Sequence, residues 1–593
     1  MTVELNVFGA WDYVVLVLVL LISASIGVYY RLTGGRQKTN REYLLADGSM
    51  AITPVAISLM ASFMSAITLL GVASENYTYG AQFVVINISY GIFTALAAYM
   101  YLPVFFRLQA TSAYEYLEKR FGKTARLSAS ICYTLQMVIY MGIVLYAPAL
   151  ALEALTGISI TAAILSVGIV CTFYSSIGGM KAVLMTDVFQ SILMFVAVFN
   201  VIIGEWVRTG SLGEIWRRAV EGGRINMWNF NPDPTVRHTW FSLIIGGGVT
   251  FLSLYGVNQT QIQRYLTLKS LNRAQKALWL NWPILTALSL STSFAGLCIY
   301  SRYYNCDPVT AGYLSRSDQL MPYYVVETMG TVPGISGLFV AGIFSASLST
   351  ISAGVNSLAA ITVEDYWKPI HLKLYGKPLS EKKSAVLTKV LAVVAGGLFI
   401  VLAFVAQYMG NLLQAALTIF GVVGGPLLGL FSLGMFTTHA NEPGAVVGLV
   451  TGLGVALWSG FGTPRPTPER LPVSIEGCVN ATTFLTTSSQ PTLHIARNSG
   501  NSDYFWLYRI SYLYNGVVGL IATMVVGIFV SYIIYCVRGR KEVQMDPNLF
   551  VPPLARRLEK RWGTLQNSSE VVSASAEKLT EVGYEKTKET CPP

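Results

Sequence analysis

The chain has 593 residues, of which 53% are hydrophobic and only 12% are charged. Soluble proteins carry roughly 25% charged residues, so this composition excludes an ordinary soluble surface and predicts a protein that has the lipid bilayer as its solvent. The net charge of +10 does not indicate nucleic acid, because the basic residues lie in short loops between apolar runs and form no single patch.

About thirteen apolar segments are long enough to cross a bilayer as helices, which takes roughly 20 residues each. In chain order they are 13–30, 52–74, 81–106, 127–152, 157–178, 184–204, 239–261, 277–301, 335–363, 385–408, 411–436, 444–462 and 510–535. No positively charged region precedes the first of them, so it is interpreted as a helix and not as a cleavable signal peptide. The sequence therefore predicts an all-α, multi-pass integral membrane fold.

The loop charges predict the orientation. Lys and Arg prefer cytoplasmic loops, and basic clusters follow the first, third, seventh, ninth and last predicted helices. This pattern predicts a plasma-membrane protein with its N-terminus outside and a cytoplasmic tail, 541–593, whose mixed polar composition indicates disorder or loose order. The loop 205–238 disagrees, because it would lie outside and yet holds five arginines.

Two further features fall in loops that are predicted to lie outside. Asn480 begins a glycosylation sequon in the loop 463–507. Cys306 and Cys478 lie in two such loops, where oxidising conditions permit a disulfide, although two free thiols fit the sequence equally well. No cysteine spacing resembles a metal site.

A transporter needs a polar site near the middle of the membrane, formed where helices break. Small and hydroxylic residues mark candidate breaks, and they are dense at 58–68 in the second predicted helix and at 345–352 in the ninth. The alternative is that such residues only allow helices to pack closely. Glycines at 246–256 indicate a bend in the seventh helix, which would be the counterpart of the second if helices 2–6 and 7–11 form two inverted halves.

Asp187 is a rare charge inside a predicted span. A carboxylate within the membrane is a functional candidate by default, although an interfacial aspartate that caps the helix start beside Thr186 is the competing interpretation. The chain has no Gly-x-Ser-x-Gly elbow, His-Glu-x-x-His motif or phosphate loop, so an enzyme or an ATP-driven pump is not indicated. For a transporter, an ion gradient then remains as the source of energy that moves the solute across the membrane.

At these residues the chain resembles the sodium/solute symporter family, which includes the sodium–glucose cotransporters. The matching motifs include Thr-Asp-Val-Phe-Gln at 186–190, and the resemblance runs from about Trp11 to Arg540 through the segments 111–121, 146–150, 178–183, 186–190, 255–259 and 263–265. Within the family it is similar to the anion branch of monocarboxylate, multivitamin and iodide transporters. The stretch 62–68 is most similar to the monocarboxylate transporters, because the multivitamin transporter has glutamine at the position of Met64 and the iodide transporter has glutamine at the position of Thr68.

The resemblance implies a LeuT-type fold with a 5+5 inverted repeat, one extra helix at the N-terminus and two at the C-terminus. The implied organisation is an extracellular N-terminus at 1–12, the extra helix and its loop at 13–50, a first repeat at 51–204, an extracellular loop at 205–238, a second repeat at 239–436, the extra helices at 437–540 and the tail at 541–593.

The resemblance also implies the site. A sodium ion would bind between the second and ninth helices, held by the hydroxyls of Ser349 and Thr350 and by carbonyls near Ala61, Met64 and Ala346; such oxygens suit a hard cation. A second cluster would hold another sodium ion or the substrate: Ser62, Ser65, Thr68, Tyr140, Asp187, Gln190 and Gln259. Tyr255, Leu417 and Phe420 would line the cavity.

The implied function is sodium-coupled import of a small organic anion of the lactate, pyruvate or nicotinate type. No arginine lies inside a predicted span to pair with a carboxylate, so the anion would rely on helix N-termini, hydroxyls, amides and nearby Na⁺. The alternatives are biotin or pantothenate, iodide, and a membrane sensor that binds a solute without transporting it.

Overall fold

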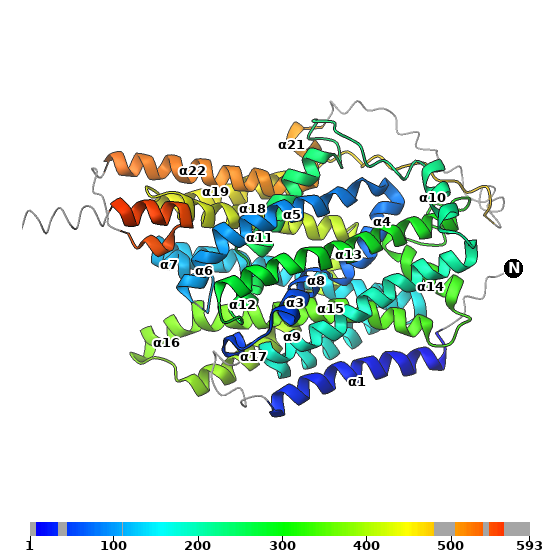
Figure 1. Ribbon diagram of the computed structural model, residues 1–593, viewed down its shortest axis with the longest axis horizontal. Coiled ribbons are helices and arrows are strands. Elements are labelled where there is room, and N and C mark those ends of the chain that lie inside the picture. Colours follow the sequence, from blue (N-terminus) through cyan, green and yellow to red (C-terminus); the bar gives the residue numbers. More distant parts are fainter. Residues whose placement is uncertain (1–7, 34–43, 110, 479–503, 538–544, 562–593) are drawn as a thin grey trace, which may run out of the picture.

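The computed structural model describes residues 8–33, 44–109, 111–478, 504–537 and 545–561, and this part of the chain is helical without any β-strand. Figure 1 shows most long helices running along the longest dimension of the molecule, with α1 at one face and α22 at the other. Large apolar side chains remain exposed on the outer helices, among them Leu21, Val394 and Phe529. This exposed apolar surface fits lipid as the surrounding solvent.

The helices have the following bounds in chain order: α1 Ala10–Thr33, α3 Ile52–Phe63, α4 Ala66–Tyr79, α5 Ile86–Leu96, α6 Leu102–Leu108, α7 Glu115–Arg120, α8 Lys123–Thr156, α9 Ile160–Thr209, α10 Leu212–Glu221, α11 Gly247–Tyr255, α12 Gln259–Tyr265, α13 Leu271–Tyr303, α14 Leu320–Met329, α15 Ile335–Ile361, α16 Lys368–Tyr375, α17 Glu381–Ala406, α18 Leu412–Phe436, α19 Glu442–Phe461, α21 Trp506–Arg509 and α22 Asn515–Val537. Short 3₁₀ or π turns join several of them, including η5 Ser317–Gln319, η6 Thr362–Trp367, η8 Tyr512–Tyr514 and η9 Pro547–Leu549.

Among the described residues, ten helices are long and apolar enough to cross a membrane, and the bent pair α3 and α4 makes an eleventh span. The other two predicted spans contain shorter apolar helices, Ile160–Phe173 and Ser242–Tyr255. Each predicted segment therefore contains helix at its expected place. The number of thirteen crossings and the inverted repeat stay predictions.

The second predicted span is broken at the expected place. Met64 and Ser65 have extended backbone angles, and the axes of α3 and α4 differ by 62°. The last carbonyls of α3 and the first N–H groups of α4 consequently lack partners within their own helices. The seventh span is also interrupted, between α11 and α12, where Asn258 caps α12 by accepting from Thr260 N over 2.9 Å.

Of the two candidate breaks, the one at 345–352 is not formed, because α15 runs without interruption from Ile335 to Ile361. Its hydroxyls bond back to carbonyls of the same helix: Thr350 Oγ1 donates to Ala346 O over 3.1 Å, and Ser352 Oγ donates to Ser349 O over 3.0 Å. Such back-bonding satisfies a buried hydroxyl within a helix without opening it. The density of hydroxyls alone therefore did not predict a break.

Helix α9 contains a kink that joins the predicted segments 157–178 and 184–204. Gly179 has φ 64° and ψ 173°, which a residue without a Cβ adopts at no steric cost. The helix resumes beyond it and carries Asp187 in its interior, fully buried. Asp187 is therefore not the interfacial cap that the sequence left open as an alternative.

Several of the unexpected arginines in the loop 205–238 are paired with carboxylates. On α10, Arg217 Nη2 lies 2.7 Å from Glu214 Oε1, and Arg218 Nε lies 2.8 Å from the same oxygen. Arg237 Nη2 reaches Glu75 Oε1 of α4 over 2.7 Å. Carboxylates of the loop and of α4 thus neutralise several of the arginines that disagree with the predicted orientation.

Disorder or loose order was expected for 541–593, but residues 545–561 are ordered and contain η9 and a helix at 552–561. Phe550 is fully buried, and Val551 N donates to Met435 O at the end of α18 over 3.2 Å. The hydroxyl of Tyr116 on α7 donates to Leu549 O over 3.0 Å. The consecutive apolar residues Leu549, Phe550 and Val551 are buried and therefore help to dock this part of the polar tail onto the bundle (Figure 1).

Candidate functional site

The centre of the candidate site is Asp187, whose carboxylate joins three helices. Ser349 Oγ of α15 donates to Asp187 Oδ1 over 2.6 Å, and Ser58 Oγ of α3 donates to Asp187 Oδ2. Arg264 of α12 completes the cluster, with Nη2 3.3 Å from Asp187 Oδ2 and Nε 2.8 Å from Ser58 Oγ. All four side chains are buried. The broken second span, the hydroxyl-bearing ninth span and the intramembrane carboxylate therefore meet at one place.

Arg264 is the residue that sequence reasoning missed. Arg264 belongs to the basic cluster that follows the seventh predicted span, where the sequence predicts a loop, yet its side chain is fully buried. All seven residues of α12 are buried, including Gln259, Gln261 and Gln263. The signal that could have found it is the run of amides directly after the break, because a polar helix that follows an interrupted span is a candidate lining of a site.

The residues assigned to the sodium site all lie inside the bundle. Ala61 lies in the last turn of α3 and Met64 directly follows this helix at the break, while Ala346, Ser349 and Thr350 lie on α15, which packs against α3. The Ser349 hydroxyl faces Asp187, whereas the Thr350 hydroxyl bonds to Ala346 O. The donor set consists of hydroxyl and carbonyl oxygens beside one carboxylate, and such oxygens suit a hard cation.

The expected second cluster divides into separate parts. Tyr140 OH lies 3.5 Å from Ser65 Oγ at the break, and its ring meets Phe420 edge-on at 4.4 Å between centroids. Ser62 accepts from Gln261 Nε2 over 3.1 Å and donates to Leu59 O over 3.1 Å. These contacts surround the break and do not reach Asp187.

The amide of Gln259 bonds to a different segment of the chain. Its Oε1 accepts from Ala113 N over 2.7 Å, and its Nε2 donates to Thr111 O over 2.8 Å. Gln190 is fully buried, and neither polar atom of its amide has a hydrogen-bond partner within the described part of the chain. Thr68 is half-buried, and its backbone N–H donates to Ser65 O over 3.0 Å.

Two of the three expected cavity-lining residues, Tyr255 and Phe420, lie near the break. Tyr255 OH donates to Leu59 O over 3.1 Å, and its ring stacks on Phe251 at 4.4 Å and meets Phe63 at 5.8 Å between centroids. Leu417 and Phe420 are buried on α18. Aromatic rings thus stand on both sides of the interrupted backbone.

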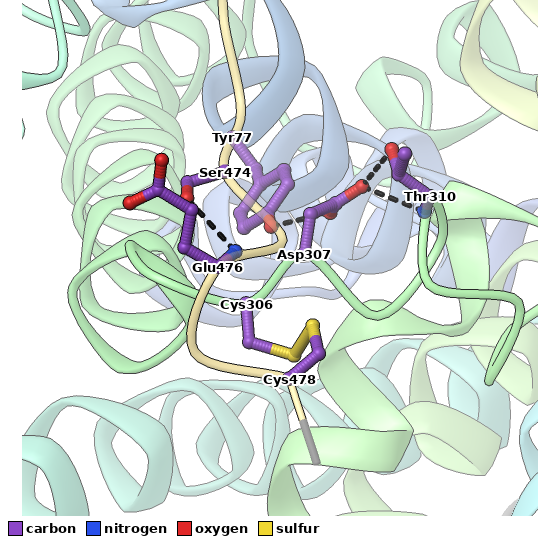
Figure 2. The surroundings of a disulfide bond; sticks show 7 residues. All are labelled: Tyr77, Cys306, Asp307, Thr310, Ser474, Glu476 and Cys478. Carbon is purple, nitrogen blue, oxygen red and sulfur yellow. Dashed lines mark hydrogen bonds between the residues drawn. A yellow bond between two sulfur atoms is a disulfide. The ribbon is translucent and has the colours of Figure 1, made fainter. Parts of the chain in front are cut away.

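At another part of the bundle a disulfide tethers the loop after α19. Figure 2 shows the bond between Cys306 and Cys478, beside Asp307, which accepts from Tyr77 OH of α4 over 2.6 Å. Asp307 N also donates to Ser474 O over 2.8 Å. The loop is therefore anchored to α4, the second helix of the broken span. Asn480, the predicted glycosylation site, lies outside the described residues.

Comparisons with known proteins identify the family. The model of the "Sodium:solute symporter family" matches residues 43–452. The chain is 51% identical over 599 residues to a Drosophila melanogaster protein named "Putative sodium-dependent multivitamin transporter", with 98% of this chain and 99% of that one covered. It is 45% identical over 557 residues to Homo sapiens sodium-coupled monocarboxylate transporter 1, with 92% and 90% covered.

Among solved structures, a substrate-bound, outward-open Na⁺-coupled sialic acid symporter has the same fold. The TM-score is 0.72 at 24% identity, and the match covers 89% of this chain and 98% of that one. These relatives are transporters and not enzymes. The chain belongs to the sodium:solute symporter family.

Proposed function

We propose that this symporter imports a small organic anion, of the lactate, pyruvate or nicotinate type, together with Na⁺. The observation that carries the proposal is the broken backbone at Met64 and Ser65, inside a bundle where Asp187 and Ser349 are in contact. Interrupted helices present oxygen atoms that replace the hydration shell of a cation. Each Na⁺ that enters gains about 2.3 kcal/mol per 100 mV, before its concentration gradient is counted.

The sodium ion would bind between α3 and α15. Its ligands would be the carbonyls of Ala61, Met64 and Ala346 and the hydroxyls of Ser349 and Thr350. Support comes from their common burial and from the packing of the two helices against each other. The neighbouring carboxylate of Asp187 would add negative charge beside this sodium ion. The alternative is that the carboxylate is itself a ligand of a further sodium ion.

The anion would bind on the other side of the break, near Ser65 and Tyr140. Helix α4 begins there, and a helix N-terminus carries free N–H groups and the positive end of the helix dipole. The hydroxyl of Tyr140 supplies a further donor, and the ring of Phe420 supplies an apolar wall. This arrangement suits a carboxylate on a small organic body. More than one Na⁺ per anion would balance its charge.

A multivitamin substrate such as biotin or pantothenate is the second candidate. The Drosophila relative at 51% identity is named for that substrate class, whereas the human relative at 45% is named for monocarboxylates. The monocarboxylate assignment is favoured by the stretch 62–68, with Met64 and Thr68, which is most similar to the monocarboxylate transporters.

Uptake in oocytes tests the proposal. Labelled lactate, nicotinate, biotin and iodide would each be offered in sodium buffer and in choline buffer, with surface expression measured in parallel. We expect saturable uptake of lactate and nicotinate that disappears in choline. Stronger biotin uptake would assign the multivitamin class. Solute-evoked current without uptake would indicate a sensor, and uptake that persists in choline would refute sodium coupling.

We also propose the topology of thirteen spans with inverted halves at 51–204 and 239–436. Support comes from Figure 1, where α1 begins at the end of the bundle opposite to the segment 545–561, as an odd number of spans requires.

With the N-terminus outside, Asn480 would carry a glycan. Treatment with a peptide glycosidase should then increase the gel mobility of the wild-type protein and leave Asn480→Gln unchanged. Equal mobility of the treated and untreated wild type would contradict this placement of the loop.

A further inference from the structure

The guanidinium of Arg264 is fully buried, and each of its three nitrogen atoms has a partner. Nε donates to Ser58 Oγ over 2.8 Å, Nη1 donates to Thr260 O over 2.9 Å, and Nη2 lies 3.3 Å from Asp187 Oδ2. Burying a guanidinium is costly unless a charge of opposite sign pairs with it. Asp187 supplies that charge.

The same carboxylate touches the proposed sodium site through its other oxygen. Ser349 Oγ donates to Asp187 Oδ1 over 2.6 Å, so a cation bound to the Ser349 oxygen would lie beside Asp187. One carboxylate would then face two positive charges, the Na⁺ and the guanidinium of Arg264. Inside the bundle these charges repel each other more strongly than they would in water.

We propose that Arg264 is a tethered counter-ion that holds Asp187 when Na⁺ is absent and competes with Na⁺ for this carboxylate. The proposal rests on the sodium site at Ser349 described above. It explains how the carrier can change conformation without its cargo. When Na⁺ leaves, Arg264 neutralises Asp187, so that the empty bundle does not contain an unpaired buried carboxylate. When Na⁺ binds, the contact between Arg264 and Asp187 weakens.

A purely structural ion pair would behave differently. Removing its arginine would lower the stability of the protein with and without sodium, and it would not make sodium bind more tightly. Competition predicts the opposite change in sodium affinity. A binding measurement on the purified protein therefore separates the two roles without any transport assay.

The experiment is a sodium titration of thermal stability on the purified, detergent-solubilised full chain, with choline keeping the ionic strength constant. Arg264→Gln should lower the half-maximal Na⁺ concentration by about fivefold or more, the lower end of ordinary coupling between sites. Arg264→Lys keeps a tethered cation and should stay near the wild-type value. The matched control is Arg224→Gln, since Arg224 is equally buried but donates to the carbonyls of Tyr77, Gly222 and Pro472. It should lose stability at an unchanged sodium midpoint.

The outcomes are distinguishable. An unchanged or higher midpoint in Arg264→Gln would overturn the competition, and so would an equal fall in Arg224→Gln. If Arg264→Gln does not fold, Ser58→Ala carries the test. It removes one donor to Asp187 and one acceptor of Arg264, so the midpoint should also fall, and an unchanged midpoint would again overturn the proposal. If sodium does not stabilise even the wild type over choline, the sodium site itself is refuted.

Discussion

Replacing Ser349 with alanine tests the proposed sodium site at a single oxygen atom. In the structure this hydroxyl donates to Asp187 Oδ1 over 2.6 Å, and both residues are buried. A hydrogen bond to a charged group is worth about 1.5–3 kcal/mol. If the lost oxygen contributes a similar free energy to Na⁺ binding, the Na⁺ concentration for half-maximal uptake should rise on the order of 10- to 100-fold.

Ser347→Ala is the matched control for this substitution. Ser347 lies two residues away on α15, is equally buried, and donates to Val144 O of α8 over 3.0 Å instead of to Asp187. Its loss should cost about 1 kcal/mol of stability, as for a neutral hydrogen bond, and leave the sodium dependence unchanged. Thr350→Ala added to Ser349→Ala should deepen the sodium defect, because the Thr350 hydroxyl otherwise bonds only within its own helix.

The assay is uptake of labelled lactate across a sodium titration, balanced with choline and normalised to surface-biotinylated protein. The reasoning fails if Ser349→Ala reaches the surface normally and keeps the wild-type sodium dependence. It also fails if Ser347→Ala shifts the sodium curve as far as Ser349→Ala does, because that result would indicate a general effect of packing in α15.

Three further predictions concern the loops and the C-terminal segment. Burial raises the pKa of Asp318, in η5, to about 6. The folded protein therefore binds a proton at this carboxylate more tightly than the unfolded chain does. The free energy of unfolding should consequently increase as the pH falls from 7 to 5. Asp318→Asn should remove this pH dependence in thermal unfolding and stabilise the protein at pH 7.5 by up to about 3 kcal/mol. Cys306→Ser with Cys478→Ser should lower stability by about 2–5 kcal/mol, since the disulfide closes a long loop; thermal unfolding with and without reductant checks this, and equal curves for variant and wild type would contradict it. Phe550→Ala removes a fully buried ring and should release the segment 545–561 to limited proteolysis, whereas an unchanged cleavage pattern would show that the ring does not hold the segment.

The positions of the helices were predictable because apolar length is a direct consequence of the bilayer as solvent. The break at Met64 and Ser65 was also predictable, but the denser run of hydroxyls at 345–352 gave no break in α15. A hydroxyl either bonds back to its own helix or meets a partner elsewhere, and local sequence does not decide between these outcomes. Which of the two occurs depends on the groups that the rest of the fold places next to the hydroxyl.

The docking of 545–561 was missed for a related reason. Composition describes the tail as polar, and a polar segment on average cannot bury enough apolar surface to become ordered. The average hides Leu549, Phe550 and Val551, which pack where Arg107 Nη2 donates to Phe550 O over 3.2 Å. These three consecutive apolar residues, together with the buried Ala555 and Leu558, hold the segment on the bundle.

The counter-ion of Asp187 was missed because hydropathy equates polar with exposed. The polar run in α12 ended the predicted seventh span at residue 261, and Arg264 was therefore assigned to a loop. In the folded chain that run is buried, because its side chains find partners on other segments: Gln261 on α3, Gln259 at Thr111 and Ala113, and Arg264 at Asp187. The physical rule that would have found it was already available. A carboxylate within the membrane requires a partner, so the search for that partner should extend past the apolar run to the first cation beyond each broken span.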